Sequence, residues 1–403
     1  MSKGKDLKPH IGIFGRRNYG KSSLINTLAN QDIAIVSDIA GTTTDPVKKS
    51  MEIADLGPVI LVDTAGIDDD SDLGKERIRK SLLQISQIDL AILVIVNSVF
   101  ESFEEDLIQT FSKNDVPYLI VQNKMDLFPI DSAKSNALAI CLQVPVIHFS
   151  CINRNNVDTL HQEINKMMPR NALHFNSLVG DIIKKDDVVL LVTPIDTEAP
   201  VGRMILPQVQ VIRDVLDNHA VVVTLRETEL RNYLKVMHPK PVLVITDSQV
   251  FELVNSIVPA EIPLTGFSVV LARQKGNFEA YLKGTPKLAE LKEGDRVLLL
   301  ESCTHHVSCD DIGQVKIPKW LDKFSNKKIE YEMVSGLESL KRPITDYAMV
   351  IQCGGCVITQ KQVKNRLRPA IEAGIPVTNY GLAIAFMHGI FERATAPFKK
   401  NIC

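Results

Sequence analysis

The chain has 403 residues, more than one hydrophobic core normally organises, so we expect several domains. Its 46 Lys and Arg residues nearly balance 48 Asp and Glu residues, and this near-neutral composition offers no basic excess for nucleic acid. Apolar runs are strand-length rather than membrane-spanning, and the polar N-terminus has no signal-peptide pattern. These features predict a soluble cytoplasmic protein that binds neither nucleic acid nor membranes.

The first 172 residues alternate between strand-like and helical patterns. Five apolar runs indicate strands, at residues 11–14, 59–62, 91–96, 118–122 and 146–149. Strands that alternate with helices form βαβ units, in which the strands run parallel. We therefore predict an α/β domain with a mostly parallel sheet at residues 1–172.

Two further α/β domains are predicted after a stretch near residues 169–176 in which Pro and Asn interrupt the pattern. The first, at 173–265, has predicted strands at 188–193, 220–224 and 242–245. The second, at 266–403, has predicted strands at 297–300, 329–333, 348–352 and 377–379. The expected fold is therefore α/β throughout, in three domains.

A glycine-containing loop after the first predicted strand matches a phosphate-binding pattern. The segment from Gly15 to Ser22 fits G-x-x-x-x-G-K-[ST] and opens a predicted helix. Gly15 and Gly20 let the backbone turn its N–H groups toward phosphates. Lys21 is expected to reach the β- and γ-phosphate oxygens, and Ser22 is expected to ligate Mg²⁺. Ser23 completes the predicted nucleotide-binding residues of this P-loop.

Two later segments are predicted to contact the γ-phosphate end of the nucleotide. Asp63-Thr-Ala-Gly66 follows a predicted strand, which places the Asp63 carboxylate near Mg²⁺ and the Gly66 amide near the γ-phosphate. Thr43 is the candidate that closes on Mg²⁺ when the γ-phosphate is present. The predicted catalytic residues are Lys21, Thr43, Asp63 and Gly66. Ile67 stands where Ras-type proteins place a water-orienting glutamine, so intrinsic hydrolysis is expected to be slow.

The base-reading segment is Asn123-Lys124-Met-Asp126, which follows another predicted strand. The Asp126 carboxylate can accept hydrogen bonds from N1–H and the exocyclic amine of guanine, groups that adenine does not present. Ser150-Cys151, at the end of the next strand, fits a loop that supports the base through a backbone amide. Together the motifs predict a Ras-like GTPase domain that binds and hydrolyses GTP.

Three of the seven cysteines are predicted to share one edge of a sheet. Cys303 follows the strand at 297–300, and Cys353 and Cys356 follow the strand at 348–352 in a Cys-Gly-Gly-Cys turn. If these strands are parallel, the sulfurs meet at their carboxyl edge, where open α/β sheets bind ligands. The glycines allow a tight turn and can present N–H groups toward sulfur.

Spacing leaves the chemistry of these cysteines open. Three thiolates suit a zinc ion or an iron–sulfur cluster, the Cys-x-x-Cys pair alone suits a dithiol, and unliganded thiols are a further alternative. We favour the cluster, because a dithiol leaves Cys303 unused. Candidates for a fourth ligand are His305, His306, Cys309 or solvent. Cys141 and Cys151 lie in apolar stretches and are expected to be buried.

The G-R-x-N-x-G-K-S loop and the D-I-A-G-T-T segment resemble the TrmE and Era class of GTPases. In that class the loop asparagine can help to hold potassium, so the resemblance implies that Asn18 is a K⁺ ligand. Such a domain followed by Cys303-Thr-His305, a spacer and Cys353-Gly-Gly-Cys356 resembles the HydF family, the maturation GTPases of [FeFe]-hydrogenases. The segment at 194–208 is also similar to that family.

The HydF resemblance implies properties that the residues alone do not. It implies a GTPase domain at 1–172, a dimerisation domain at 173–265 and a cluster-binding domain at 266–403. It also implies a [4Fe–4S] cluster held by Cys303, Cys353 and Cys356 with an exchangeable fourth position. His305 is the candidate fourth protein ligand, and Gln352 stands where the family commonly has a second histidine.

The same resemblance implies a scaffold and carrier role. The carried species would be the two-iron subcluster precursor, delivered to apo-[FeFe]-hydrogenase. The implied partners are the radical-SAM maturases HydE and HydG, the hydrogenase, and a second copy of the chain in a homodimer or a dimer of dimers.

Two rival interpretations remain from the sequence. One is an RNA-modification or ribosome-assembly GTPase, the other common role of TrmE and Era relatives, which would need a basic RNA-binding surface. The other keeps the GTPase but places a structural zinc ion at the cysteines, which would make the C-terminal half an interaction module.

Overall fold

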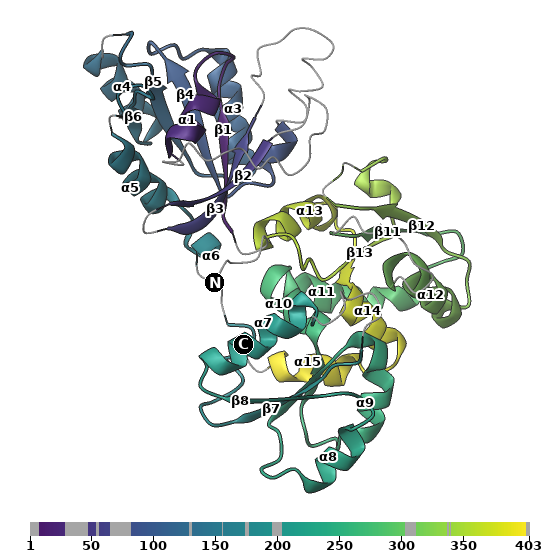
Figure 1. The fold of residues 1–403 in the computed structure, drawn as a ribbon. Helices are drawn as coiled ribbons and strands as arrows, with labels where there is room; N and C mark the ends of the chain where they lie inside the picture. The colour runs from purple at the N-terminus through teal and green to yellow at the C-terminus, as the bar shows by residue number, and fades with distance from the viewer. Residues whose placement is uncertain are drawn as a thin grey trace. The chain divides into compact units, whose positions relative to one another are not determined.

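The computed structural model describes residues 8–28, 47–53, 56–64, 82–128, 131–154, 156–173, 177–195, 204–302, 312–336, 338 and 340–399. The chain forms two compact units, residues 1–175 and 176–403, whose elements are labelled in Figure 1.

The N-terminal unit is built on a six-stranded sheet with the order β2-β3-β1-β4-β5-β6. Its strands are β1 (His10–Phe14), β2 (Val47–Ile53), β3 (Gly57–Asp63), β4 (Leu90–Val96), β5 (Tyr118–Asn123) and β6 (Val146–His148). Its helices are α1 (Lys21–Leu28), α3 (Ser102–Lys113), α4 (Ser132–Leu142), α5 (Val157–Met167) and α6 (Arg170–Leu173). All neighbouring strands are parallel except β2, which pairs antiparallel with β3.

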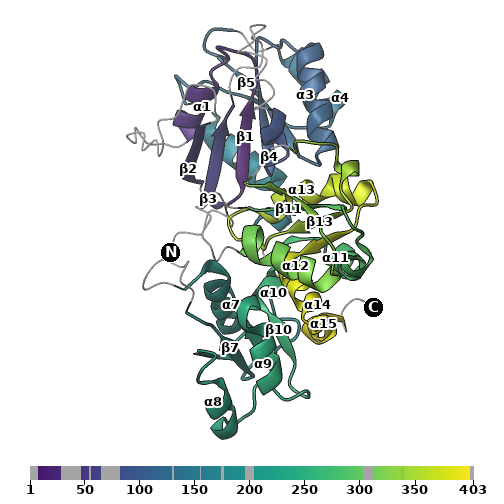
Figure 2. The same cartoon turned by 90° about the vertical axis from the view of Figure 1, so that its right-hand side faces the viewer.

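Helices cover both faces of this sheet, so its central strands are apolar along their whole length. Alternate β4 side chains enter two separate cores, and every residue of β4 is buried. One core adds Leu24 of α1 and Leu160 of α5, and the other adds Leu107 and Phe111 of α3. Figure 2 shows α1 on one side of β1 and α3 on the other. This three-layer arrangement confirms the predicted α/β fold with a mostly parallel sheet.

The C-terminal unit contains two four-stranded parallel sheets, with the orders β10-β9-β7-β8 and β12-β11-β13-β14. The strands of the first sheet are β7 (Val188–Val192), β8 (Val221–Leu225), β9 (Leu243–Thr246) and β10 (Leu264–Gly266). Those of the second are β11 (Arg296–Leu300), β12 (Glu330–Val334), β13 (Met349–Gln352) and β14 (Val377–Asn379). In both sheets the second strand of the chain, β8 or β12, lies at one edge beside the first strand. The third and fourth strands then lie on the other side of the first strand. The strand order therefore reverses between β7 and β9 and between β11 and β13, where open α/β sheets bind ligands.

Helices follow most strands of this unit. Their bounds are α7 (Leu206–Asp217), α8 (Leu230–Val236), α9 (Phe251–Ile257), α10 (Phe267–Lys275), α11 (Phe278–Gly284), α12 (Ile317–Ser325), α13 (Gln360–Glu372), α14 (Tyr380–Met387) and α15 (Phe391–Lys399). One hydrophobic core runs from the first sheet through α10 to one face of the second sheet, where it includes Leu298 and Val350. The opposite face of the second sheet packs on α12 and α14. The two sheets thus share a core.

The sequence missed two strands, and each omission has a physical reason. β2 is an edge strand with exposed Lys48 and Ser50, so it lacks an apolar run. β10 has only three residues, and the expected domain boundary at 265/266 falls within it. Division into three domains stays a prediction.

The expectation that Cys141 and Cys151 are buried is wrong for Cys141, which is exposed on α4. Cys151 is only partly buried.

Among the helices of the described residues, none combines the length and the apolar character that crossing a membrane requires.

Candidate functional site

The phosphate-binding loop lies between β1 and α1 and depends on two glycines. Gly15 has φ 141° and Gly20 has φ 88°, backbone conformations that side chains disfavour. A Cβ atom at Gly15 would lie 2.4 Å from the Val94 carbonyl oxygen of β4, and one at Gly20 would lie 2.4 Å from Asn123 Nδ2. The loop therefore packs directly on β4 and on the base-reading segment.

The lysine of the loop is buried at its centre. Lys21 is 7% exposed, and its Nζ donates to the carbonyl oxygens of Gly15 and Arg16, both at 2.8 Å. Asn18 is exposed, with φ 62°, a conformation that asparagine tolerates. Ser23 lies in the first turn of α1, and its side chain is exposed.

Two oxygen groups suited to Mg²⁺ meet beside this loop. Ser22 Oγ donates to Asp63 Oδ2 at 2.7 Å. The contact forms because β1 and β3 are parallel neighbours, with Ile13 opposite Asp63 in the register. Hydroxyl and carboxylate oxygens are the ligands that Mg²⁺ prefers. The other predicted residues of this end, Thr43, Gly66 and Ile67, lie outside the described residues.

The base-reading residues form one hydrogen-bonded group at the carboxyl ends of β5 and β6. Asn123 Nδ2 donates to the Tyr19 carbonyl oxygen at 2.9 Å, which links this group to the phosphate-binding loop. Ser150 Oγ donates to Asp126 Oδ1 at 2.6 Å, and Cys151 Sγ donates to Asn123 Oδ1 at 3.5 Å. Asp126 is itself exposed, so its carboxylate is accessible to a base.

Two features of this group concern Lys124 and Cys151. Lys124 has φ 60°, and its carbonyl oxygen accepts the N–H groups of Leu127 and Phe128 in a tight turn. Burial raises the pKa of the Cys151 thiol, so it stays protonated and can donate to Asn123.

Sequence reasoning missed a salt bridge that anchors the phosphate-binding loop. Arg16 Nε and Nη2 donate to the two carboxylate oxygens of Glu104, at 2.8 and 2.9 Å, and Nη2 also reaches Glu101 at 2.8 Å. Glu104 is fully buried at the beginning of α3. Nothing in the pattern G-x-x-x-x-G-K-S assigns a partner to its second residue, and only the fold brings Glu104 to it.

The second candidate site lies where β11 and β13 end. These strands are parallel, with Leu300 opposite Gln352, which confirms the predicted parallel pairing and brings Ser302 next to Cys353. Cys353 Sγ accepts the N–H of Ser302 at 3.1 Å and the N–H of Gly355 at 3.5 Å. The glycine turn therefore presents an N–H group to Cys353, as its composition indicated.

Gln352 occupies the position where a second histidine ligand would stand. Its side chain is fully buried, and Nε2 lies 3.1 Å from Ser302 Oγ, 3.2 Å from the Cys353 carbonyl oxygen and 3.4 Å from Cys353 Sγ. The carbonyl accepts hydrogen bonds only, so it fixes the amide with Nε2 toward the sulfur. Gln352 Oε1 is buried without a hydrogen-bond partner among the described residues.

Within the described part of the chain, no three His, Cys, Asp or Glu side chains gather as a metal site. Two of the predicted cluster ligands, Cys303 and His305, fall outside the described residues, as do His306 and Cys309. Cys353 and Cys356 are described, and both are partly buried and outside any disulfide.

Known proteins resemble different parts of the chain. A family model described as a 50S ribosome-binding GTPase matches residues 10–124. The tRNA modification GTPase MnmE of Coxiella burnetii is 38% identical over 174 residues, which cover 42% of this chain and 37% of the relative. MnmE of Nitrosomonas europaea is 37% identical, and the match covers 39% of this chain and 34% of the relative. The chain thus spans little more than a third of these curated relatives.

Among solved structures, a variant of Era from Aquifex aeolicus bound to GDP and AlF4⁻ is 18% identical with a TM-score of 0.35, covering 57% of this chain and 98% of that one.

Two further family models match the C-terminal unit. The hydrogen maturase F dimerization domain matches residues 178–276, and the hydrogen maturase F tetramerization domain matches residues 279–397. These ranges contain both parallel sheets and the Cys-Gly-Gly-Cys turn, and they follow a GTPase domain. The chain belongs to the hydrogen maturase F (HydF) family.

Proposed function

We propose that this chain is a GTP-hydrolysing scaffold and carrier in [FeFe]-hydrogenase maturation. The observation that carries the proposal is the sheet edge at which Ser302 and the Cys353–Cys356 turn meet, in a HydF chain that also has a GTPase domain. The nucleotide would act as the switch and the cysteine edge as the place where the two-iron precursor is assembled or carried.

The described nucleotide residues suit GTP and Mg²⁺. Ser22 and Asp63 supply adjacent oxygen ligands, and Lys21 lies within the loop that would enclose the phosphates. Thr43 would complete the metal ligands and Gly66 would contact the γ-phosphate. Asn18 would hold a stimulating K⁺ ion, and hydrolysis would be slow because Ile67 cannot orient water through hydrogen bonds.

The cysteine edge suits a [4Fe–4S] cluster held by Cys303, Cys353 and Cys356. The N–H groups of Ser302 and Gly355 directed at Cys353 Sγ are the donors that bridging sulfides and thiolates need. When bound, such a cluster supplies an iron with an exchangeable coordination position for the precursor. His305 is the candidate for that position, whereas Gln352 already serves as a hydrogen-bond donor to the turn.

The partners proposed for this chain are HydE, HydG and apo-[FeFe]-hydrogenase. The two matched family models are named for dimerization and tetramerization, so we also propose a homodimer or a dimer of dimers.

Anaerobic purification with iron, sulfide and zinc analysis tests the cluster. We expect a brown protein with roughly four iron and four acid-labile sulfide per chain. Cys353→Ser should lose most of that iron, because a hydroxyl is a poor ligand for iron–sulfur clusters. Cys141→Ser, on an exposed helix position, is the matched control and should retain it. A colourless wild-type protein with stoichiometric zinc would reject the proposal.

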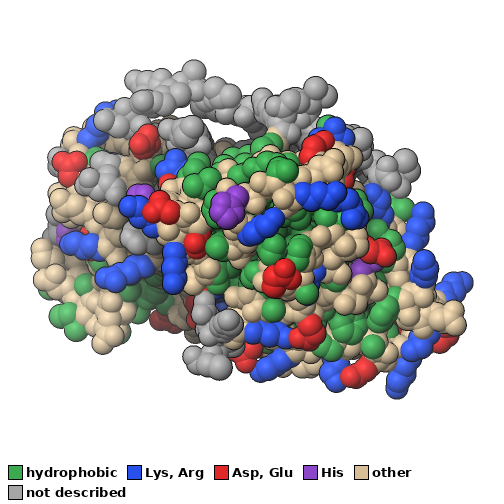
Figure 3. Space-filling view, turned by 90° about the horizontal axis from the view of Figure 1, so that it is seen from below, with side chains coloured by type: hydrophobic (Ala, Val, Ile, Leu, Met, Phe, Trp, Pro, Cys, Tyr) green, Lys and Arg blue, Asp and Glu red, His purple; other side chains and the backbone are tan. Residues whose placement is uncertain are grey.

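The alternative is a tRNA-modification or ribosome-assembly GTPase with a structural zinc site. It is favoured by the likeness to MnmE, but that likeness covers only about two fifths of this chain. On the face shown in Figure 3, the Lys and Arg side chains that the structure describes are interspersed with Asp and Glu rather than gathered in one basic patch. Co-purification of bound RNA, together with zinc, would support the alternative.

A further inference from the structure

A buried amide links the base-reading segment to the phosphate-binding loop. Asn123 is 2% exposed at the end of β5, and its Nδ2 donates to the Tyr19 carbonyl oxygen of the loop at 2.9 Å. The same nitrogen packs so closely on the loop that a Cβ atom at Gly20 would overlap it. The position of this amide therefore affects the phosphate-binding loop as well as the base-reading segment.

The orientation of the amide follows from what each of its atoms can do. Because the Tyr19 carbonyl oxygen only accepts hydrogen bonds, it must receive Nδ2, and Oδ1 then points the other way. There Oδ1 meets the Cys151 thiol, whose Sγ lies 3.5 Å away. Oδ1 has no proton to donate, so the thiol is the donor of this hydrogen bond. The thiol thus satisfies a buried oxygen of Asn123 and fixes the direction of its amide.

The surroundings of Cys151 favour the protonated thiol that this role needs. Burial raises the pKa of the thiol, and the nearby Asp126 carboxylate adds to the rise, whereas the Thr27 hydroxyl and Asn123 oppose it. Thr27 lies on α1, where its Oγ1 also donates to the Ser23 carbonyl oxygen at 2.9 Å. The thiol therefore contacts α1 as well as the base-reading segment.

A simpler role for Cys151 is that of a small apolar side chain, as half-buried cysteines often have. Cys151 does pack against the core that includes Leu24 and Leu160. An apolar side chain of similar size would fill the same space but would remove the donor from Asn123 Oδ1. Leaving a buried acceptor without a donor costs more free energy than one hydrogen bond contributes. The amide would then move, and the loop would lose the contact at Tyr19.

We propose that Cys151 is a positioning residue for guanine nucleotides, whose thiol holds the Asn123 amide and through it orders the phosphate-binding loop before a nucleotide binds. The proposal deepens the nucleotide site of the proposed function: it rests on GTP binding by this domain and is independent of the cysteine edge. A loop that is already ordered loses less conformational entropy when phosphates bind, so its affinity for them is higher.

This role predicts a change in binding rather than in the chemical step. The thiol supports the loop equally before and during hydrolysis, and an interaction of that kind affects KM and leaves kcat unchanged. A neutral hydrogen bond of this type corresponds to a change in affinity of about threefold to tenfold.

The test compares Cys151→Ala, Cys151→Val and Cys151→Ser with Cys141→Ala in the full chain. Ala and Val both lack a donor, Val refills the space, and Ser keeps a donor. Cys141 is the matched control, because its thiol is exposed on α4 of the same unit. Fluorescent-nucleotide titration gives Kd, and steady-state hydrolysis gives KM and kcat. We expect Kd and KM to rise about threefold to tenfold in Ala and Val at unchanged kcat. Ser should lie closer to wild type, and Cys141→Ala should match it.

A double-mutant cycle tests whether the thiol acts through Asn123. Asn123→Ala removes the amide, so adding Cys151→Ala to it should cost no further affinity. If Asn123→Ala binds GTP too weakly to measure, hydrogen exchange of the loop gives the same comparison without nucleotide.

Hydrogen exchange of the nucleotide-free chain provides this independent measurement. Peptides covering residues 16–20 should exchange faster in Cys151→Ala and Cys151→Val than in wild type, while peptides of β1 and β4 stay protected. If Cys151→Ala fails to fold, as judged by circular dichroism, the Val variant carries both measurements.

The outcomes separate this inference from the proposed function. Wild-type chain that binds no guanine nucleotide contradicts the proposed function, and exchange of the loop then still decides whether the thiol orders it. Wild-type chain that binds GTP, together with unchanged Kd in the Ala and Val variants, overturns the inference. A Val variant that matches wild type while Ala is weakened also overturns it, because the effect is then one of packing. Additive losses from Asn123→Ala and Cys151→Ala overturn the route through the amide.

Discussion

At the scale of single residues, the carboxylate proposed to read the base is exposed and is held by one buried hydroxyl. Ser150 is fully buried, and its Oγ lies 2.6 Å from Asp126 Oδ1, which leaves the other carboxylate oxygen accessible. A fixed acceptor loses less conformational entropy on binding than a mobile one. Ser150 was expected to support the base through its backbone, and the structure adds that its hydroxyl orients Asp126.

Asp126→Asn should change the base that the chain binds. The substitution removes the charge and replaces one acceptor oxygen by an NH₂ group, which would face a donor of guanine. Losing one charged hydrogen bond and weakening the other, at about 1.5 to 3 kcal/mol per bond, predicts GTP binding weaker by roughly 100-fold. Xanthine has a carbonyl where guanine has the amine, so XTP affinity should rise. Fluorescent-nucleotide titration measures both, and unchanged GTP affinity would show that Asp126 does not contact the base.

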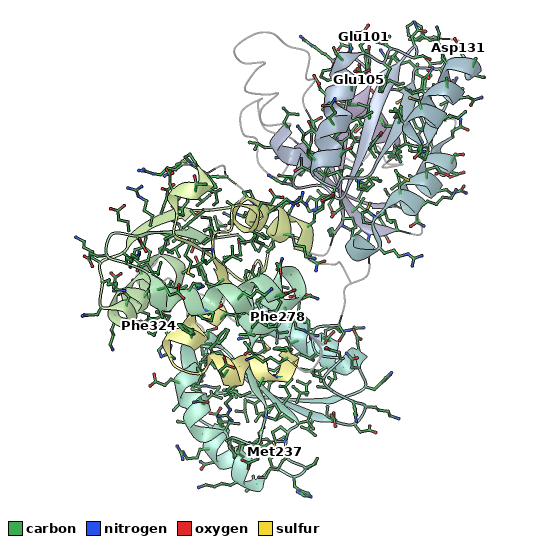
Figure 4. All side chains as sticks on the ribbon, turned by 180° about the vertical axis from the view of Figure 1, so that it is seen from behind. Glu101, Glu105, Asp131, Met237, Phe278 and Phe324 are labelled. Carbon is green, nitrogen blue, oxygen red and sulfur yellow. The ribbon has the colours of Figure 1, made fainter. Side chains whose placement is uncertain are left out.

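At the scale of elements, the N-terminus of α3 supports the phosphate-binding loop. Glu104 accepts from Arg16 and also accepts the N–H of Glu101 at 3.0 Å, so one buried carboxylate caps the helix and anchors the loop. The ring of Phe103, on the same turn, packs against the guanidinium of Arg16. The Arg16 Cζ atom lies 5.4 Å from the centroid of that ring. Figure 4 labels Glu101 and Glu105 at this end of α3.

Glu104→Ala should therefore destabilise the N-terminal unit and weaken nucleotide binding together. Removing one partner of a buried ion pair leaves the other charge uncompensated, which predicts a loss of about 2 to 3 kcal/mol in the free energy of unfolding. Hydrogen exchange of β1 and β4 peptides at increasing urea concentrations measures it. Glu105→Ala, one residue away on the exposed side of the helix, is the control, and equal losses in both variants would contradict the role of the ion pair.

At the scale of the whole molecule, the two sheets of the C-terminal unit share one hydrophobic core, and the second sheet has another core on its opposite face. Helix α15 returns to the first sheet and contacts β10, and Figure 2 labels both elements. Its Arg393 donates to Asn255 Oδ1 at 2.7 Å and to the carbonyl oxygens of Val258 at 2.9 Å and Ile262 at 3.2 Å. Phe398 of α15 packs edge-on against Phe278 of α11, whose position Figure 4 labels. Helix α15 thus packs on a sheet whose first strand, β7, begins about 200 residues earlier.

Arg393→Met should lower the stability of both sheets of this unit at once. Removing the guanidinium leaves several carbonyl acceptors without their donor, which predicts a loss of about 2 to 4 kcal/mol in the free energy of unfolding. Trp320, the only tryptophan, lies on α12 beside the second sheet, so its fluorescence reports on a region remote in sequence from the first sheet. A shift of its urea midpoint indicates a shared core.

The control for this prediction is Lys399→Met, an exposed position of the same helix. A Trp320 transition that is unchanged by Arg393→Met, while exchange in β7 and β9 increases, would show instead that the two sheets unfold separately.

Much of the fold and of the nucleotide site was predictable because its signals are local. The apolar runs of β1, β4 and β5 are continuous, since a central parallel strand is buried on both faces. A motif begins directly after β1, at Gly15, and at the last residue of β5, Asn123. The pattern that contains Gly15 and Lys21 can be recognised from consecutive residues alone. β2 and β10 were missed because one is a polar edge strand and the other is three residues long, so neither has an apolar run.

The sequence by itself determined the class of the domains, the order of the phosphate- and base-reading motifs, and the likeness to the HydF family. Only the tertiary structure decided which residues support those motifs: Glu104 for the phosphate-binding loop, Ser302 for Cys353, and Lys275, which donates to the Gly355 carbonyl oxygen, for the cysteine turn. The physical reason is that these supports join residues from about 50 to nearly 90 positions apart. Their energies depend on burial and distance, which exist only once the strands are aligned.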